Sequence, residues 1–394
     1  MLAIVPIAAV GLTAQTAVSI TSCCTTNVVY TFNAGHIPSS NTTSGGSANL
    51  QATGASGQDQ LFANWWYYRV ASDTREFSFN RAATSGLQNP SAPIVVNAKG
   101  DTAVIEWVDV DGKGFDARLT TKVYSTSATS GAATQTMEIT NRTGAPLTIN
   151  IFNYADFDVC QSAGTDSAVF AGPPQQLHIT DASSCGVTAV HLACNFTNYH
   201  TAPFGSTSAQ SLMTNTVVDN LSNTGVPFGP ADFTNGYQWQ DVQIPDGQTA
   251  TFQVVLAIDH VVPCCDVATV ESYCNGKAGT NGIPAWGDTP LFVGGETELT
   301  LQNGFAGSAP VVALGVAPGV CVPIPNIGTV AVQPILTTFF LPAFDASGVS
   351  TVCLPVPGNP ALCGASLVMQ AFFADPGAQG GIAHTAGAEF RLGS

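Results

Sequence analysis

The sequence predicts an all-β, disulfide-stabilised protein with a large N-terminal antiparallel β-sandwich and a smaller C-terminal Greek-key β-sandwich. The large unit is either one super-sandwich or two stacked ordinary sandwiches. Three observations predict this class. Glycine (39) and proline (24) are abundant, while Lys and Arg together number only 10 in 394 residues. Runs rich in β-branched residues alternate with turn signals, and no stretch has a helical period. Finally, 11 cysteines are scattered along the chain.

Residues 1–24 form an apolar leader that contains neither Lys nor Arg. Its composition is typical of a secretory signal peptide, although it lacks a basic n-region and a clean small-residue cleavage site. The alternative is an ordered apolar strand donated to the sheet of a neighbouring copy, where main-chain hydrogen bonds would join the subunits. The inserted positions would then include Ile4, Ile7, Val10 and Leu12.

Residues 25–262 form the predicted large sandwich. Two glycine-containing turns predict hairpins: residues 111–114 between Ala103–Val110 and Phe115–Tyr124, and residues 141–144 between Thr134–Thr140 and Ala145–Phe157. After the turn at residues 245–247, alternate apolar residues from Ala250 to Ile258 predict a strand with one inward face.

Residues 263–290 form a Cys/Gly/Pro-rich connector, and residues 291–394 form the predicted C-terminal sandwich. The connector resembles a junction motif of secreted proteins of planctomycete-like environmental bacteria, through Tyr273, Cys274, Lys277, Asn281, Gly282, Pro284 and Gly287. The tail resembles the β-domain that follows that junction, through Pro360, Leu362, Gly364, Gln370, Asp375 and Pro376. The N-terminal β-region resembles only uncharacterised exported proteins. In the junction family a second cysteine usually stands where this chain has Ile283, so the resemblance implies another partner for Cys274.

The cysteine pattern predicts disulfides in an oxidising compartment, because it contains no CxxC pair and no His at metal-ligand spacing. The candidates are Cys23, Cys24, Cys160, Cys185, Cys194, Cys264, Cys265, Cys274, Cys321, Cys353 and Cys363. The adjacent pairs Cys23-Cys24 and Cys264-Cys265 suggest that both ends of one domain are tied to its core. We therefore expect a secreted protein, extracellular or at the cell surface.

Charge excludes several classes of partner. The chain has 26 acidic and 10 basic residues, a net charge of −16, so it repels nucleic acids and anionic membrane surfaces. Beyond the leader, no segment is long and apolar enough to predict a membrane span. The remaining candidate partners are other copies of the chain, in polymers, and polysaccharides.

The stretch "NWWYYRV" (64–70) offers four consecutive aromatic rings. Strand alternation places Trp65, Tyr67 and Arg69 on one face, where they could stack on and hydrogen-bond a sugar. Rings on both faces favour the alternative, a strand buried on both sides. Trp239 and Trp286 are further candidate ligand-binding residues.

Asp156, Asp158 and Asp166 are a candidate calcium site, because carboxylate oxygens at a strand end suit this cation. The alternative is a solvated acidic loop. Calcium is the one cofactor that the sequence suggests.

Catalysis receives little support, since the chain has no GxSxG, HExxH or phosphate-loop motif. The sequence leaves enzymatic activity open but favours a non-catalytic structural β-protein, a subunit of a fibre, sheath or surface layer assembled by strand donation. A secreted carbohydrate-binding protein is the alternative, followed by a polysaccharide-active enzyme.

Overall fold

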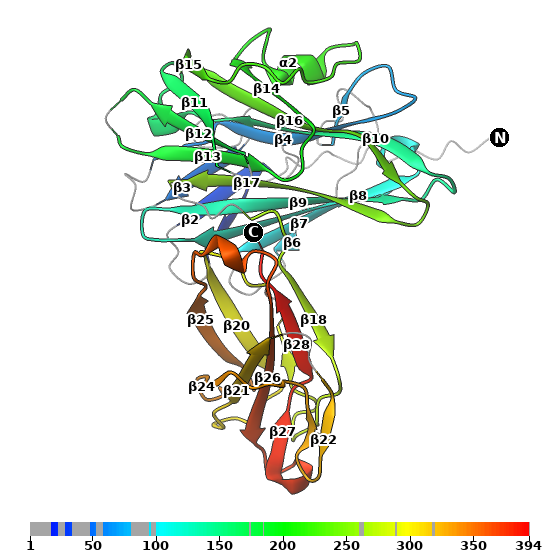
Figure 1. Cartoon of the computed structure of the whole chain (residues 1–394), viewed down its shortest axis with the longest axis vertical. Helices are drawn as coiled ribbons and strands as arrows, with labels where there is room; N and C mark the ends of the chain where they lie inside the picture. The colour runs from blue at the N-terminus through cyan, green and yellow to red at the C-terminus, as the bar shows by residue number, and fades with distance from the viewer. Residues whose placement is uncertain are drawn as a thin grey trace, which may run out of the picture.

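Figure 1 shows the computed structural model, which confirms the all-β class: antiparallel sheets account for almost all of the regular structure. The residues described are 17–22, 28–33, 48–52, 58–79, 94–95, 100–172, 175–183, 185–259, 264–287, 290–316 and 320–393. The candidate assembly positions Ile4, Ile7, Val10 and Leu12 lie outside these ranges, as do Cys23 and Cys24.

The first sheet has five strands in the order β14-β16-β10-β4-β5. They are β4 (Ala63–Val70), β5 (Phe77–Ser78), β10 (Leu147–Asp156), β14 (Asn198–Pro203) and β16 (Phe233–Ile244). The aromatic stretch forms β4, next to β10, so the candidate sugar-binding and calcium-binding residues lie on neighbouring strands.

The second sheet has nine strands in the order β15-β11-β12-β13-β17-β9-β8-β7-β6. They are β6 (Ile94–Val95), β7 (Thr102–Trp107), β8 (Phe115–Ser125), β9 (Gly131–Asn141), β11 (Asp166–Ala171), β12 (Gln176–Asp181), β13 (Thr188–Ala193), β15 (Phe228–Ala231) and β17 (Thr249–Ile258). A three-stranded sheet contains β1 (Ala17–Thr21), β2 (Val28–Asn33) and β3 (Ala48–Ala52).

One core lies between these three sheets. Trp66 of the five-stranded sheet, Leu119 of the nine-stranded sheet and Tyr30 of the three-stranded sheet all belong to it. Gln135 joins them, since it accepts a hydrogen bond from the Trp66 indole at 2.8 Å and donates to the Tyr30 hydroxyl at 3.0 Å. The apolar face of β17, including Phe252, packs into the same core as predicted.

The turn at residues 141–144 does not form the predicted hairpin. β9 pairs with β8 and β17 in the nine-stranded sheet, whereas β10 pairs with β4 and β16 in the five-stranded sheet. The turn therefore carries the chain from one layer to the other. Turn residues specify a reversal of direction, but burial of whole faces decides which strands become neighbours. The hairpin at residues 111–114 is present, because β7 pairs with β8.

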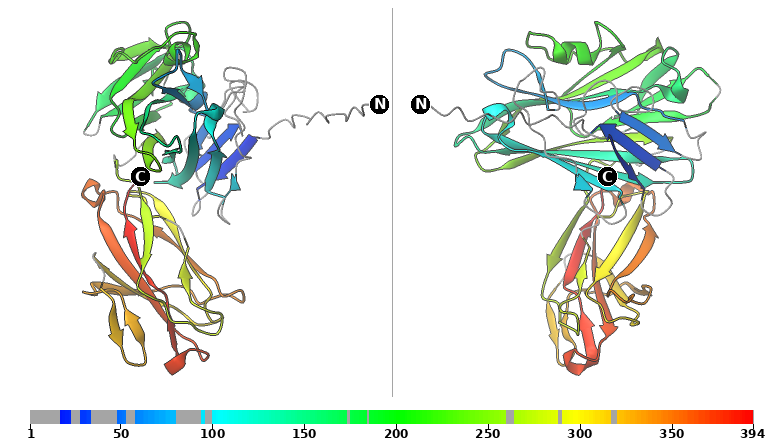
Figure 2. Two further views of the ribbon diagram at one scale, coloured as in Figure 1. Left: turned by 90° about the vertical axis from the view of Figure 1, so that its right-hand side faces the viewer. Right: turned by 180° about the vertical axis from the view of Figure 1, so that it is seen from behind.

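The C-terminal part contains three further sheets (Figure 2). The first contains β18 (Thr269–Tyr273), β21 (Val311–Val316), β24 (Thr337–Phe340), β26 (Ser366–Ala374), β27 (Ile382–His384) and β28 (Gly387–Arg391). The second contains β19 (Ala285–Trp286), β20 (Glu296–Gln302) and β25 (Ser350–Pro355). The third contains β22 (Val322–Ile324) and β23 (Gly328–Val330). β18 and β19 come from the stretch predicted as connector, which therefore contributes strands to this part of the structure.

The two parts of the chain touch through apolar side chains. Phe292 stacks on Tyr124 with ring centroids 5.3 Å apart, and Val255 and Ala257 on the outer face of β17 are buried in the same cluster. The single inward face predicted for β17 was therefore wrong, because its outer face is buried as well.

The helices among the described residues are short. They are α2 (Ala209–Thr214) and the 3₁₀ turns η1 (Val110–Gly112), η2 (Val159–Gln161), η3 (Pro360–Leu362) and η4 (Gln379–Gly381). Within the described ranges, no helix has the length and hydropathy required to cross a bilayer.

Candidate functional site

The four aromatic rings of β4 divide between two environments, as strand alternation predicts. Trp66 and Tyr68 lie in the core between the sheets. Trp65 and Tyr67 lie on the opposite face, where they pack with Tyr154 and with residues of α2. All four rings are buried, and those of Trp65 and Tyr67 are tilted by 44° at a centroid distance of 6.0 Å. They therefore form no exposed, coplanar platform in this structure.

The helix α2 covers this aromatic face. Ser208 caps the helix by accepting a hydrogen bond from the backbone N–H of Ser211 at 3.2 Å. Ala209 packs directly against Gly236 of β16, where an added Cβ would lie only 2.6 Å from the Cβ of Ala209. Met213 belongs to the same apolar cluster. Glycine at position 236 thus allows the helix to lie directly on the sheet.

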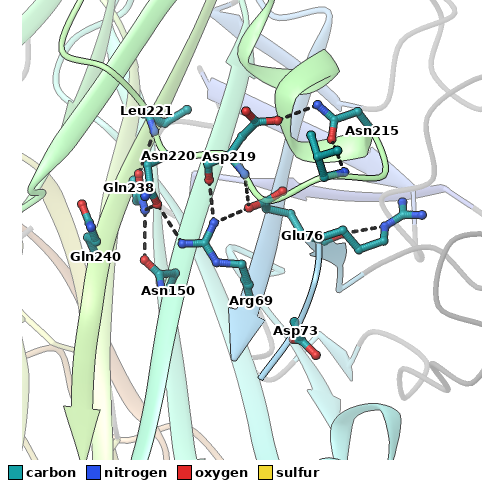
Figure 3. Close-up of polar contacts among 12 residues, drawn as sticks. Arg69, Asp73, Glu76, Asn150, Asn215, Asp219, Asn220, Leu221, Gln238 and Gln240 are labelled. Atoms are coloured by element: carbon teal, nitrogen blue, oxygen red, sulfur yellow. Dashed lines mark hydrogen bonds and ion pairs between the residues drawn. The ribbon is translucent and has the colours of Figure 1, made fainter. Parts of the chain in front are cut away.

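Polar contacts fix the chain that follows α2 to β4 (Figure 3). Arg69 forms a buried ion pair with Glu76. Its guanidinium group also donates to the Asp219 carbonyl oxygen at 2.6 Å and to Oδ1 of Asn220 at 2.7 Å. Glu76 accepts a hydrogen bond from the Asp219 backbone N–H at 3.1 Å. Burial raises the pKa of Glu76, although the Asp219 N–H and Arg69 act in the opposite direction.

Gln238 of β16 extends this network. Its side-chain amide donates to Asn150 at 3.0 Å and to Asn220 at 2.8 Å, and its side-chain oxygen accepts from the Leu221 backbone N–H at 2.8 Å. We call Arg69, Glu76, Asp219, Asn220 and Gln238 the Arg69 clamp. Because the positive charge has a buried partner of opposite sign, its contacts are those of a structural element that holds the chain after α2 in place.

The other candidate ligand-binding aromatics are also buried. The Trp239 indole donates to the carbonyl oxygen of Cys194 at 2.7 Å, and its ring stacks on Trp66. Trp286 packs edge-to-face against Phe390 at a centroid distance of 6.0 Å. These rings stabilise the cores of the two parts of the chain.

A cluster of carboxylates lies at one end of the five-stranded sheet. Oxygen atoms of Asp156, Asp158 and Asp232 all lie within 4.8 Å of one another. Asp156 ends β10, Asp158 precedes η2, and Asp232 precedes β16. Asp166, at the start of β11, acts electrostatically on Asp156. We call Asp156, Asp158, Asp166 and Asp232 the acidic rim.

The acidic rim is poorly solvated and carries charge of one sign. Burial is the largest cause that raises the pKa of Asp158 to about 6 and that of Asp166 to about 8. Burial likewise raises the pKa of Asp232, and it raises that of Asp156 well above its usual range. Repulsion between the carboxylates adds to this effect, as when Asp232 acts on Asp158.

No Lys or Arg is among the main groups that shift these four pKa values. Within the described ranges, the ion pairs of basic side chains are with other acids: Arg69–Glu76, Lys113–Asp73, Arg118–Glu106, Lys122–Asp101, Arg142–Asp116 and Arg391–Asp266. Among the residues that the structure describes, the acidic rim therefore has no cationic partner.

Three carboxylate oxygens of the rim are buried without a hydrogen-bond partner among the described residues: Oδ1 of Asp156 and both oxygens of Asp166. Asp156 is 2 % exposed, and its Oδ2 accepts from the Tyr154 hydroxyl at 3.2 Å. Its Oδ1 is fully buried and has no hydrogen-bond partner in the described part of the chain. A buried carboxylate oxygen without a donor is costly unless a cation coordinates it.

Sequence reasoning found three members of the rim and missed Asp232. Asp156 and Asp158 meet as predicted, and Asp166 lies close enough to repel both Asp156 and Asp158. Asp232 joins them because β10 pairs with β16, with Asp156 opposite Thr234. No local sequence signal shows this pairing.

An exposed aromatic ring next to the rim was also missed. Phe204 follows β14, and its backbone N–H donates to the carbonyl oxygen of Asp232 at 3.0 Å. Its side chain is 50 % exposed. Phe204 and Phe340 are the exposed aromatic residues in the described part of the chain, and Phe340 lies on β24 in the C-terminal part.

Disulfides connect elements that are distant in the sequence. The pairs are Cys160–Cys185, Cys194–Cys265, Cys264–Cys363 and Cys274–Cys321, and Cys353 is also disulfide-bonded. Cys265 ties the end of the large unit to that unit through Cys194, as expected, whereas Cys264 bonds to Cys363 in the C-terminal part. Cys264 and Cys363 also lie near Asp266, but their disulfide removes the thiolates that a metal would need.

Comparisons with known proteins add similarities at low identity. Neither a family model nor a curated protein matches the chain. Among solved structures, 63 % of the chain matches 32 % of a bacterial glucoamylase complexed with acarbose, with 9 % identity and a TM-score of 0.42. A putative aldose 1-epimerase from Escherichia coli K12 matches over 62 % of this chain and 99 % of its own, with 8 % identity and a TM-score of 0.34.

A putative kojibiose phosphorylase from the human microbiome matches 61 % of this chain over 30 % of its own length, with 8 % identity and a TM-score of 0.33. This chain therefore spans about a third of the length of the glucoamylase and of the phosphorylase. At these identities and TM-scores the matches do not assign a function.

Proposed function

We propose that this chain is an exported calcium-binding protein, with the ion held by the acidic rim, and that its function is binding rather than catalysis. The observation that carries the proposal is the meeting of Asp156, Asp158 and Asp232, whose oxygens lie within 4.8 Å of one another. The buried, unpartnered Oδ1 of Asp156 supports it independently, because that atom needs a donor or a cation.

Calcium suits this set of groups better than other common cations. It takes six to eight oxygen ligands in flexible geometry, whereas magnesium demands a small octahedron and keeps its waters. The rim offers carboxylates alone, so zinc and copper, which prefer nitrogen or sulfur, are poorly matched. Asp166 and solvent would complete the coordination. The bound ion would offset the repulsion that raises the pKa values of these carboxyl groups.

The disulfides and the calcium affinities typical of extracellular proteins agree with this proposal. The disulfides of the described residues fit an oxidising environment. Extracellular modules hold calcium with dissociation constants of about 10⁻⁴ to 10⁻³ M, weak enough for a partly exposed site. We therefore propose that the protein acts outside the cell.

The test is calcium titration calorimetry on the intact protein, together with terbium luminescence as a second probe. We expect one site, lost in the double variant Asp158→Asn/Asp232→Asn. The matched control is Glu271→Gln/Glu389→Gln, which neutralises two acids paired directly across β18 and β28. Loss of binding in the control, or no calcium binding by the unmodified protein, would overturn the proposal.

A structural subunit remains a second candidate function, and the edge of the C-terminal sheet favours it. β24 pairs with β21 on one side, and within the described residues no strand pairs with its other side. Leu336 and Phe340 are 60 % and 73 % exposed there. Exposed apolar edges promote strand addition between copies.

Electron microscopy and N-terminal mass spectrometry of the secreted protein test this second candidate. Ordered polymers that retain residues before Cys23, and that disperse when residues 2–12 are deleted, would support strand donation. Dispersed particles that begin after Ala17 would exclude it.

A further inference from the structure

We propose that the ligand of the acidic rim is a neutral glycan, which would coordinate the calcium ion through adjacent hydroxyl groups and stack one sugar ring on Phe204. This inference rests on the proposed calcium site and names what that site binds. Its support is the placement of an exposed aromatic ring at the end of the sheet that carries the carboxylates.

Strand pairing fixes the position of Phe204 relative to the rim. β14, β16 and β10 are neighbours in the five-stranded sheet. In this register Pro203 lies opposite Phe233, so Phe204 follows opposite Asp232, and the 3.0 Å backbone hydrogen bond between them confirms the contact. Cα atoms of paired residues lie roughly 5 Å apart. A ligand on the solvent-exposed side of Asp232 would therefore reach the Phe204 ring.

The partly exposed members of the rim mark the side from which a ligand would approach. Asp156 and Asp166 are buried, whereas Asp158 and Asp232 are only half-buried. The buried pair would hold the ion from inside, and a calcium ion with six to eight ligands would keep coordination positions for solvent or ligand oxygens on the side of Asp158 and Asp232.

Charge selects a neutral ligand over an anionic one. With all four carboxyl groups ionised the rim carries four negative charges, of which one calcium ion offsets two. The whole chain, including the rim, has a net charge of −16. An anionic ligand would add repulsion in a poorly solvated site. Sugar hydroxyls supply oxygen ligands without charge.

Exposure explains why Phe204, rather than the predicted aromatics, can stack on a sugar. Trp65, Tyr67, Trp239 and Trp286 are buried, so none presents a ring face to solvent. Phe204 is 50 % exposed. An apolar ring next to oxygen ligands provides the two contacts that a pyranose needs, one for its C–H face and one for its hydroxyls.

The experiment is affinity electrophoresis through gels containing mannan, galactan or dextran, with polygalacturonate as the anionic comparison, each in calcium and in EDTA. We expect retardation by at least one neutral polysaccharide in calcium alone. Phe204→Ala should weaken that binding about five- to tenfold, as expected for one stacking contact worth about 1 kcal/mol. Phe340→Ala, which removes the more exposed ring on β24, should bind as the unmodified protein does.

Terbium luminescence on the same variants separates this inference from the proposed function. Phe204→Ala should keep full metal binding, since its side chain supplies no ligand to the ion. If the unmodified protein binds no metal, the calcium site itself is wrong. If metal binds but no neutral polysaccharide is retarded, or only polygalacturonate is, or Phe204→Ala binds glycan unchanged, the glycan inference is overturned and the ion is structural.

Discussion

The Arg69 clamp and the acidic rim both include residues of the five-stranded sheet, yet their buried charges differ. The clamp contains charges of opposite sign, whereas the rim contains carboxylates alone. In the clamp, Arg69 and Glu76 neutralise each other, and backbone and amide groups add hydrogen bonds to the guanidinium group and to Oε1 of Glu76, although Oε2 of Glu76 has no hydrogen-bond partner among the described residues. In the rim, Asp156, Asp158 and Asp232 converge, and none of the ion pairs between described residues includes them.

This difference separates a structural network from a candidate binding site. A buried pair of opposite charges needs no cation from solvent, and its contacts hold the segment after α2 in place. A buried cluster of one sign is stable only if it takes up protons or a cation. The aromatic stretch, despite its sugar-binding appearance, belongs to the first kind of region.

The largest expected effect is in the clamp. Arg69→Met leaves Glu76 buried without its partner, and we expect the free energy of unfolding to fall by about 3–5 kcal/mol. Guanidinium denaturation measures the loss, and hydrogen exchange should quicken over residues 215–221. Adding Glu76→Leu should recover much of the stability, because it removes the unpaired charge. A double variant as unstable as Arg69→Met would contradict this account.

The second prediction concerns the acidic rim, where removal of charge should not lower the free energy of unfolding in the absence of calcium. At a calcium concentration of 100 times the dissociation constant, binding should stabilise the protein by about 2.7 kcal/mol, and Asp158→Asn/Asp232→Asn should abolish this gain. In EDTA the double variant should be at least as stable as the unmodified protein, because it removes repulsion. Thermal unfolding in both conditions measures this. A double variant that is less stable in EDTA would show that these acids form structural contacts.

A third prediction tests the interior between the two regions, where His191 contacts Asn153 at 3.1 Å and Asn235 at 3.2 Å. Burial lowers the pKa of His191 to about 3. The unfolded chain takes up this proton below about pH 6.5, whereas the folded chain does so only near pH 3. Stability should therefore fall as the pH drops from 6.5 towards 3, by up to about 1.4 kcal/mol per unit.

Denaturation of His191→Gln at the same pH values isolates this contribution, since the carboxyl groups are common to both proteins. The variant should lose less stability on acidification. Parallel curves would mean that His191 is already protonated, or accessible, in the folded state.

The smallest effect is expected for an exposed ion pair. Arg118 and Glu106 form a pair 3.6 Å apart, with about half of each side chain exposed. Arg118→Met should change the free energy of unfolding by less than about 1 kcal/mol, because solvent screens such pairs. A loss equal to that of Arg69→Met would show that burial does not distinguish the two pairs.

Much of the fold followed from local pattern. Alternation in β4 placed Trp66 and Tyr68 on one face and Trp65 and Tyr67 on the other, as the structure confirms. Alternation could not show that α2 covers the second face, since the helix follows more than 130 residues later in the chain and is held there by tertiary contacts.

The candidate site was predicted only as far as one strand and its following loop. Asp156 and Asp158 were accessible to sequence reasoning because they are neighbours in the chain. Asp232 and Phe204 were not, because only the pairing of β16 with β10 and β14 brings them next to Asp156 and Asp158.

The sequence by itself determined the all-β class, the two-sided burial of β4 and the presence of disulfides, since periodicity, turn residues and cysteine spacing are local properties. Only the tertiary structure decided that the turn at residues 141–144 crosses between sheets, that Cys264 and Cys265 bond to different parts of the chain, and that Asp232 completes the acidic rim. The physical reason is that local pattern sets which face of a strand is apolar, whereas the burial of those faces across long separations sets which strands become neighbours.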